Sequence, residues 1–122
     1  MVEAIPSPDG AFWFRLVPLD GQQPGRRSLR LEVGGPGSDP PYVSRAVWPE
    51  WFALDAAWDE RQRVWVASAD SGVNVFARRD GEWRRFAWEA GIDASRQPPL
   101  DDVSTGESVE WLDAEPPPGL RP

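Results

Sequence analysis

Apolar and polar residues alternate with a period of two in several segments of the chain, which is the pattern of half-buried β-strands. Residues 11–19 and 27–33 show it most simply. In the second segment, Leu29, Leu31 and Val33 fall on one face, with polar side chains between them. The two segments are expected to pair as neighbouring antiparallel strands.

A three-stranded antiparallel meander is predicted over residues 64–68, 73–78 and 82–88. Asp80-Gly81 between the last two strands is a strong signal for a two-residue hairpin. The hairpin sets the register of the pair. It places four apolar side chains on one face: Val73, Val75, Phe86 and Trp88.

The turn near residues 70–72 decides which face Trp65 occupies. A two-residue turn at Ser71-Gly72 would place Trp65 opposite Arg78, which already lies opposite Trp83, so the guanidinium would stack between two indoles. A three-residue loop would move Trp65 to the other face. The first alternative makes this ladder a candidate binding face.

The remaining segments are less regular. Residues 42–48 predict a short strand that Pro49 ends, and residues 51–58 favour a strand over a helix. Residues 34–41 and 89–102, rich in Gly, Pro and Asp, are predicted as loops.

Residues 104–112 fit a helix that begins with a capping box and equally fit a last strand. The Pro-rich arm beyond them is expected to pack across the sheet through Trp111 and Leu112, with Trp111→Ala costing about 3 kcal/mol. We therefore predict an all-β fold: an antiparallel meander of five to seven strands in a small sandwich or open barrel. Residues 1–90 form the β domain, and residues 91–122 form a loop and arm on the same domain.

Short turn motifs resemble the blade repeats of TolB-type β-propellers. Residues 7–10, Ser-Pro-Asp-Gly before an aromatic strand, resemble the opening of one blade, and residues 54–59, 64–68 and 72–76 resemble a second. Two blades cannot close a propeller, which takes at least four. The resemblance implies a meander-built β protein that could self-associate, and it implies no activity.

Composition restricts the chemistry further. The 122 residues carry a net charge of −7, all 13 basic residues are Arg, and His, Cys and Lys are absent. The commonest general base, thiolate nucleophiles and Schiff-base lysines are thus excluded. We expect no enzymatic activity, no cofactor and no metal site, since the paired carboxylates a glycosidase would use are better explained as solvated turn residues.

The acidic balance disfavours nucleic acids and anionic membranes and favours a basic protein partner. The segment from Met1 to Pro6 has no basic region and no long apolar run, so a cytoplasmic location is expected. The leading hypothesis is a small protein-binding module, with an immunity-type inhibitor of a basic partner as its sharpest form. Homo-oligomers, a structural subunit and a carbohydrate-binding β-sandwich with Trp platforms stay open.

Eight Trp residues and neighbouring carboxylates supply the candidate contacts. Six lie on the least regular segment and three on the predicted ladder. The candidates are Trp48, Trp51, Trp58, Asp55, Asp59 and Glu60, with Trp65, Arg78 and Trp83.

Overall fold

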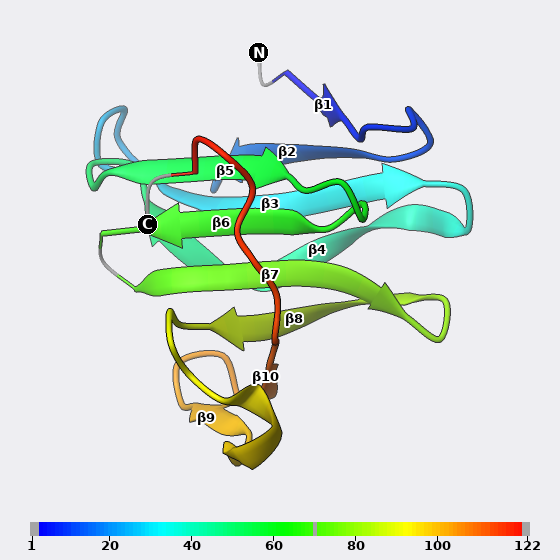
Figure 1. Cartoon of the computed structure of the whole chain (residues 1–122). Helices are drawn as coiled ribbons and strands as arrows, with labels where there is room; N and C mark the ends of the chain where they lie inside the picture. The colour runs from blue at the N-terminus through cyan, green and yellow to red at the C-terminus, as the bar shows by residue number, and fades with distance from the viewer. Residues whose placement is uncertain (1–2, 70, 121–122) are drawn as a thin grey trace.

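The computed structural model describes residues 3–69 and 71–120, and in it the chain forms two β-sheets packed face to face (Figure 1). The first sheet has four strands in the order β1-β2-β3-β4. The second has six, in the order β5-β6-β7-β8-β10-β9. The predicted all-β, mostly antiparallel and sandwich-like architecture is confirmed.

Ten strands and one short 3₁₀ helix make up the regular structure of the described residues. Their bounds are β1 Ile5–Pro6, β2 Trp13–Pro18, β3 Ser28–Gly35, β4 Ser38–Pro49, β5 Leu54–Trp58, β6 Val64–Ser68, β7 Gly72–Arg79, β8 Glu82–Trp88, η1 Ala94–Arg96, β9 Leu100–Asp102 and β10 Glu107–Trp111. The count exceeds the predicted five to seven, because strands as short as β1 and β9 leave no periodic pattern in the sequence.

The four-stranded sheet contains the predicted β2–β3 pair, with Leu16 opposite Leu31. The predicted loop over residues 34–41 is wrong. The strands β3 and β4 extend through most of it and are joined by Pro36-Gly37 alone. Pro followed by a Gly with φ of 77° suits a type II turn, so this segment closes a hairpin.

The β7–β8 hairpin has the predicted register. Arg79 lies opposite Glu82, and Arg78 lies opposite Trp83. Asp80 and Gly81 take φ values of 55° and 81°, which is the left-handed backbone that a two-residue hairpin turn needs at both positions.

The β6–β7 hairpin corrects the predicted ladder. Ser68 pairs with Gly72, so Trp65 lies opposite Val75 and three positions away from Arg78. A shift by an odd number of residues reverses the face of every side chain. The ladder of Trp65, Arg78 and Trp83 is therefore absent from the described structure, and Trp65 shares the face of Val75. Asp70, one of the predicted turn residues, lies outside the described residues.

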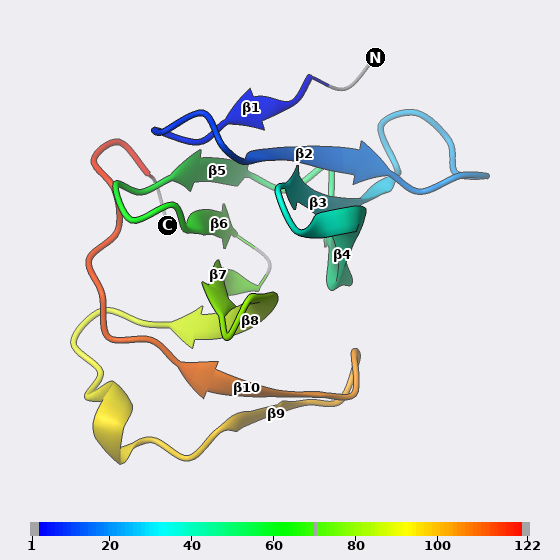
Figure 2. The same cartoon turned by 90° about the vertical axis from the view of Figure 1, so that its right-hand side faces the viewer.

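Residues 104–112, for which a helix and a strand were equally expected, contain the strand β10. It pairs in parallel with β8 through Glu110–Phe86 and Trp111–Ala87, and antiparallel with β9. Figure 2 shows β9 and β10 extending the six-stranded sheet beyond the part that faces β1–β4.

Two apolar clusters bury both faces of the central meander. The cluster between the sheets joins Phe14 and Trp48 to Phe76 and Trp83. The second cluster lies on the outer face around Trp65, Val75 and Phe86, and it includes Leu120 of the C-terminal arm, with Leu112 packed against it. Figure 1 shows this arm, in red, crossing β5 to β7.

A hydrogen bond ties the arm to the sheet: the Trp88 indole N–H donates to the Ala114 carbonyl at 2.7 Å. Of the two predicted anchors, Leu112 packs against the outer cluster, while Trp111 is half-buried on the opposite side of its strand and donates to the Pro98 carbonyl. The face that carries Val73, Val75, Phe86 and Trp88 is thus a core face, as the hairpin register predicts.

Candidate functional site

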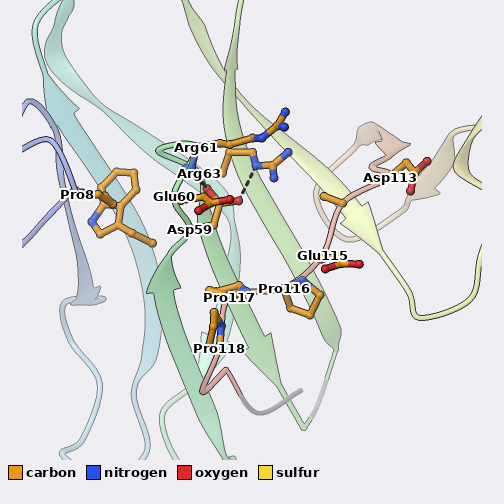
Figure 3. A pocket seen from close by; sticks show the side chains of 12 residues that line it. Pro8, Asp59, Glu60, Arg61, Arg63, Asp113, Glu115, Pro116, Pro117 and Pro118 are labelled. Carbon is orange, nitrogen blue, oxygen red and sulfur yellow. Dashed lines mark hydrogen bonds and ion pairs between the residues drawn. The ribbon is translucent and has the colours of Figure 1, made fainter.

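A groove lies between the turn that joins β5 to β6 and the C-terminal arm (Figure 3). Its volume is about 690 Å³, within the range of about 300–1,000 Å³ typical of binding pockets. One wall is formed by residues 58–63, and the other by residues 113–118. The groove therefore contains Trp58, Asp59 and Glu60, three of the predicted contacts.

The buried Asp59 carboxylate stabilises the first wall of the groove through four hydrogen bonds. Its Oδ1 accepts hydrogen bonds from the backbone N–H groups of Arg61 and Arg63 at 2.9 and 3.0 Å. Its Oδ2 accepts from Arg63 Nε at 2.6 Å and from the Trp65 indole N–H at 2.8 Å. All four bonds stay within the turn and the following strand, so Asp59 holds the wall in shape.

The electrostatics of Asp59 agree with this structural role. The side chain is 6% exposed. Burial alone raises the pKa of its carboxyl, but the hydrogen bonds from Trp65 and Arg63, with the charge of Arg63, outweigh it and lower the pKa. Asp59 is ionised and fully bonded, which leaves it no free lone pair of good geometry for a partner.

Three other carboxylates at the groove have no such bonds. The side chains of Glu60, Asp113 and Glu115 are exposed and make no hydrogen bond or ion pair within residues 3–69 and 71–120. Arg61 is the one cation at the groove that is likewise unpaired there, since Arg63 is bound to Asp59. The groove thus carries an excess of negative charge that its own residues do not neutralise.

The apolar part of the groove comes from prolines and one indole. Pro8 lies on one side, and Pro116 and Pro117 on the arm form the opposite side (Figure 3). Trp58 is half-buried, donates its indole N–H to the Ile5 carbonyl at 2.9 Å and packs edge-on against Phe14. Its ring is held in place, so it forms a rigid part of the wall.

Burial removes several predicted contacts from the candidate site. Trp48, Trp65 and Trp83 are 1%, 0% and 7% exposed, because their faces of the sheets are covered by the opposite sheet or by the arm. No partner can reach these three rings in this fold. The expectation that they form a binding surface is corrected accordingly.

The other predicted contacts are dispersed. Trp51 is 53% exposed beside Phe52 on the β4–β5 connection. Asp55 is half-buried on β5 opposite Ala67. Arg78 is exposed, and its guanidinium lies over the Phe12 ring at 5.2 Å. None of these three lines the groove.

The sequence analysis missed the second wall. Asp113, Glu115 and the prolines after them supply half of the groove, yet they are separated from Asp59 by more than 50 residues. The one local signal was a run of prolines next to acidic residues, which indicates an extended exposed segment but not the surface it crosses.

The chain matches no family model, no curated protein and no solved structure. Within the described ranges, no helix has the length and apolar character needed to cross a bilayer. In the same residues, no three carboxylates are grouped so that they could hold a metal ion.

Proposed function

We propose that this chain is a protein-binding module without catalytic activity that receives a basic segment of a partner protein in the groove of Figure 3. The observation that carries the proposal is the set of three unpaired carboxylates, Glu60, Asp113 and Glu115, on both walls of one groove. An inhibitor of the immunity type, which neutralises a basic protein, is its sharpest form.

Two physical arguments support a basic partner. The groove brings carboxylates next to a proline-lined wall, so the methylene stem of an Arg or Lys can pack while its charged end pairs. The net charge of −7 also attracts a basic protein over a distance and raises the association rate.

The binding free energy expected from these contacts is modest. An exposed ion pair contributes about 0.2–1 kcal/mol. Three such pairs give roughly 0.6–3 kcal/mol, which corresponds to roughly a 3- to 150-fold change in affinity.

The test is capture of partners from the native lysate by wild type and two variants, with mass spectrometry of the captured proteins. The triple variant Glu60→Gln, Asp113→Asn, Glu115→Gln neutralises the groove. A matched control neutralises three exposed carboxylates elsewhere: Asp20→Asn, Glu82→Gln and Glu89→Gln. Both variants have the same net charge, so any loss from long-range attraction is equal.

We expect wild type and the control to retain one basic protein at moderate salt, and the groove variant to retain at least about threefold less of it. Equal capture by both triple variants would show that the groove is not the contact. Capture of no partner, or of this chain alone, would overturn the proposal.

One observation favours self-association as a second candidate. The 12-residue strand β4 is an edge of its sheet, and Val43 and Val47 on it are 43% and 45% exposed. An edge strand can pair with a second copy. Light scattering that shows mass rising with concentration would support this candidate. Sugar binding has less support, because Trp51 alone among the eight Trp residues is exposed.

A further inference from the structure

A separate cavity opens on the inner face of the six-stranded sheet, which is the face that packs Phe76 and Trp83 against the other sheet. Figure 2 shows β9 and β10 extending this sheet past the part that β1–β4 cover. The cavity is lined by residues of β7 to β10 and the adjoining turns, and its volume is about 390 Å³. That volume lies within the range of about 300–1,000 Å³ for small-molecule sites.

Strand pairing places one residue from each of three strands in a row across the floor of the cavity. Asn74 on β7 lies opposite Ala87 on β8, which lies opposite Trp111 on β10. Residues paired in this way project from the same face of a sheet. Neighbouring strands are about 4.8 Å apart, so the backbones at Asn74 and Trp111 are roughly 10 Å apart. Ala87 ends at its methyl group, which leaves a hollow between an amide and an indole.

Apolar side chains form one end of this row. Trp111 is half-buried, and its indole N–H donates to the Pro98 carbonyl at 3.1 Å, which holds the ring in one orientation. Leu100 on β9 lies opposite Val109, two residues before Trp111, so it projects from the same face. Leu100 is 43% exposed. The Trp111 ring, Leu100 and Ala87 together give the cavity an apolar surface against which a flat aromatic group can pack.

Asn74 supplies a hydrogen-bond donor at the other end of the row. It is the one Asn of the chain, and it is 4% exposed. Its Oδ1 accepts from Arg85 Nε at 2.8 Å, and because an Arg side chain can only donate, this bond fixes which amide atom faces Arg85. The Nδ2 group makes no hydrogen bond within residues 3–69 and 71–120. Buried donors are normally bonded, so Nδ2 is available to the acceptor of a ligand.

The charges around the cavity disfavour an anionic ligand. Arg85 pairs with Asp102 at 2.7 Å and with Glu107 at 3.1 Å, so its charge is already balanced. Glu89 also lines the cavity, is exposed and makes no ion pair within the described part of the chain. These four groups sum to a charge of −2, from 1 − 3. A negative ligand would be repelled, whereas an uncharged one would not.

We propose that this cavity binds a flat, uncharged aromatic molecule that carries a carbonyl oxygen. The ring lies over Ala87 against Trp111, and the carbonyl oxygen accepts from Nδ2 of Asn74. Such a ligand covers the apolar surface, bonds the free donor and adds no negative charge. The cavity shares no lining residue with the groove of Figure 3, so this proposal is independent of the proposed function.

The experiment is an NMR titration of the full ¹⁵N-labelled chain with benzamide and, separately, with benzoate, each up to roughly 20 mM at constant ionic strength. The two probes have nearly the same shape and differ in charge. The side-chain NH₂ signals of Asn74 and the indole N–H signal of Trp111 report on the two ends of the row. Spectra of Asn74→Asp and Trp111→Phe assign these signals, because each substitution removes the signals of its own residue.

We expect benzamide to shift both sets of signals in a saturable way, with one dissociation constant on the order of 1 mM. Benzoate should bind at least tenfold more weakly. Asn74→Asp keeps an acceptor for Arg85 but replaces the donor with a carboxylate, so it should weaken benzamide binding at least tenfold, as followed at Trp111. The matched control Gln23→Glu makes the same change of amide to carboxylate on an exposed loop and should change binding less than twofold.

Ala87→Leu provides a second variant, because it fills the hollow without removing a polar contact and should abolish benzamide binding. Thermal unfolding verifies that each variant retains the fold. The proposal is overturned by the absence of saturable shifts at Asn74 and Trp111 in wild type, or by benzoate binding as tightly as benzamide. Both results need only the wild-type chain. Unchanged binding in Ala87→Leu, or equal effects of Asn74→Asp and Gln23→Glu, would also overturn it. None of these results bears on the groove.

Discussion

Asp59→Asn tests whether the groove wall is held by a buried carboxylate. The amide keeps one acceptor oxygen but replaces the other with an NH₂ group, which would face donors. At least two of the four hydrogen bonds are then lost, and the Trp65 N–H or the backbone N–H pair is left without an acceptor. The Trp65 side chain is 0% exposed, so water cannot replace a lost bond there.

The expected loss follows from the number and type of these bonds. A hydrogen bond to a charged group contributes about 1.5–3 kcal/mol, and an orphaned buried donor costs about 1–3 kcal/mol. We expect Asp59→Asn to lower the free energy of unfolding by about 3 kcal/mol, a large part of the roughly 5–15 kcal/mol of a typical domain.

Urea denaturation followed by tryptophan fluorescence measures the effect. With a slope of about 1–3 kcal/mol per molar urea, the midpoint should fall by about 1–3 M. The control is Asp9→Asn, since Asp9 accepts from the Ser7 hydroxyl and the Ala11 N–H in an exposed turn. That control should shift the midpoint much less.

The pH dependence gives a second readout. Folding lowers the pKa of Asp59 from its ordinary value of 3.8, so its contribution is complete above that pH and is lost as the pH falls through the folded pKa. The difference between wild type and variant should therefore shrink below about pH 4. A midpoint shift no larger than that of the Asp9 control would refute the structural role of Asp59.

Three further predictions concern other parts of the fold. Gly34→Ala should cost about 1–2 kcal/mol in urea denaturation, because the new Cβ would lie 2.2 Å from Cζ2 of Trp13, and Trp13→Ala in the same chain should remove most of the added cost. Trp111→Ala should cost about 2 kcal/mol, below the 3 kcal/mol of a buried anchor, because the ring is half-buried and bonded to the Pro98 carbonyl; a midpoint equal to wild type would contradict this. Absorbance at 295 nm during alkaline titration should show the Tyr42 phenol ionising near pH 12, and ionisation near 10 in the folded protein would contradict its burial.

The parts of the fold that were predictable have local causes. Asp80-Gly81 fixes the β7–β8 register, because few residue pairs tolerate left-handed backbone at both positions. The alternation in β3 places Leu31 and Val33 in the core for a similarly local reason, the period-two geometry of a strand.

The parts that were missed depend on distant residues. The position of β10 beside β8 results from packing across more than 20 residues, and neither strand carries a signal for the other. The eight Trp residues look alike in the sequence, yet Trp48 is in the core and Trp51 is exposed, because the opposite sheet covers only one of them.

The candidate site also has one part that was predictable from local sequence and one part that depends on distant residues. Trp58, Asp59 and Glu60 are adjacent in sequence, so their proximity was predictable, but the internal hydrogen bonds of Asp59 were not. The arm residues Asp113 and Glu115 reach the groove only because the outer face of the sheet anchors the arm. A single sequence does not encode that placement in any local pattern.

The arm also bears on the order of events during translation. The outer face of the meander, around Trp65, Val75 and Phe86, is covered by Leu112 and Leu120. Leu120 leaves the ribosome 32 residues after Trp88, from 120 − 88, which is roughly 2–6 s at roughly 5–20 residues per second. During that interval the nascent chain presents an aromatic sheet face to chaperones and to other nascent chains. Substitutions that loosen the arm should therefore reduce the yield of folded protein in cells more than they reduce its stability once folded.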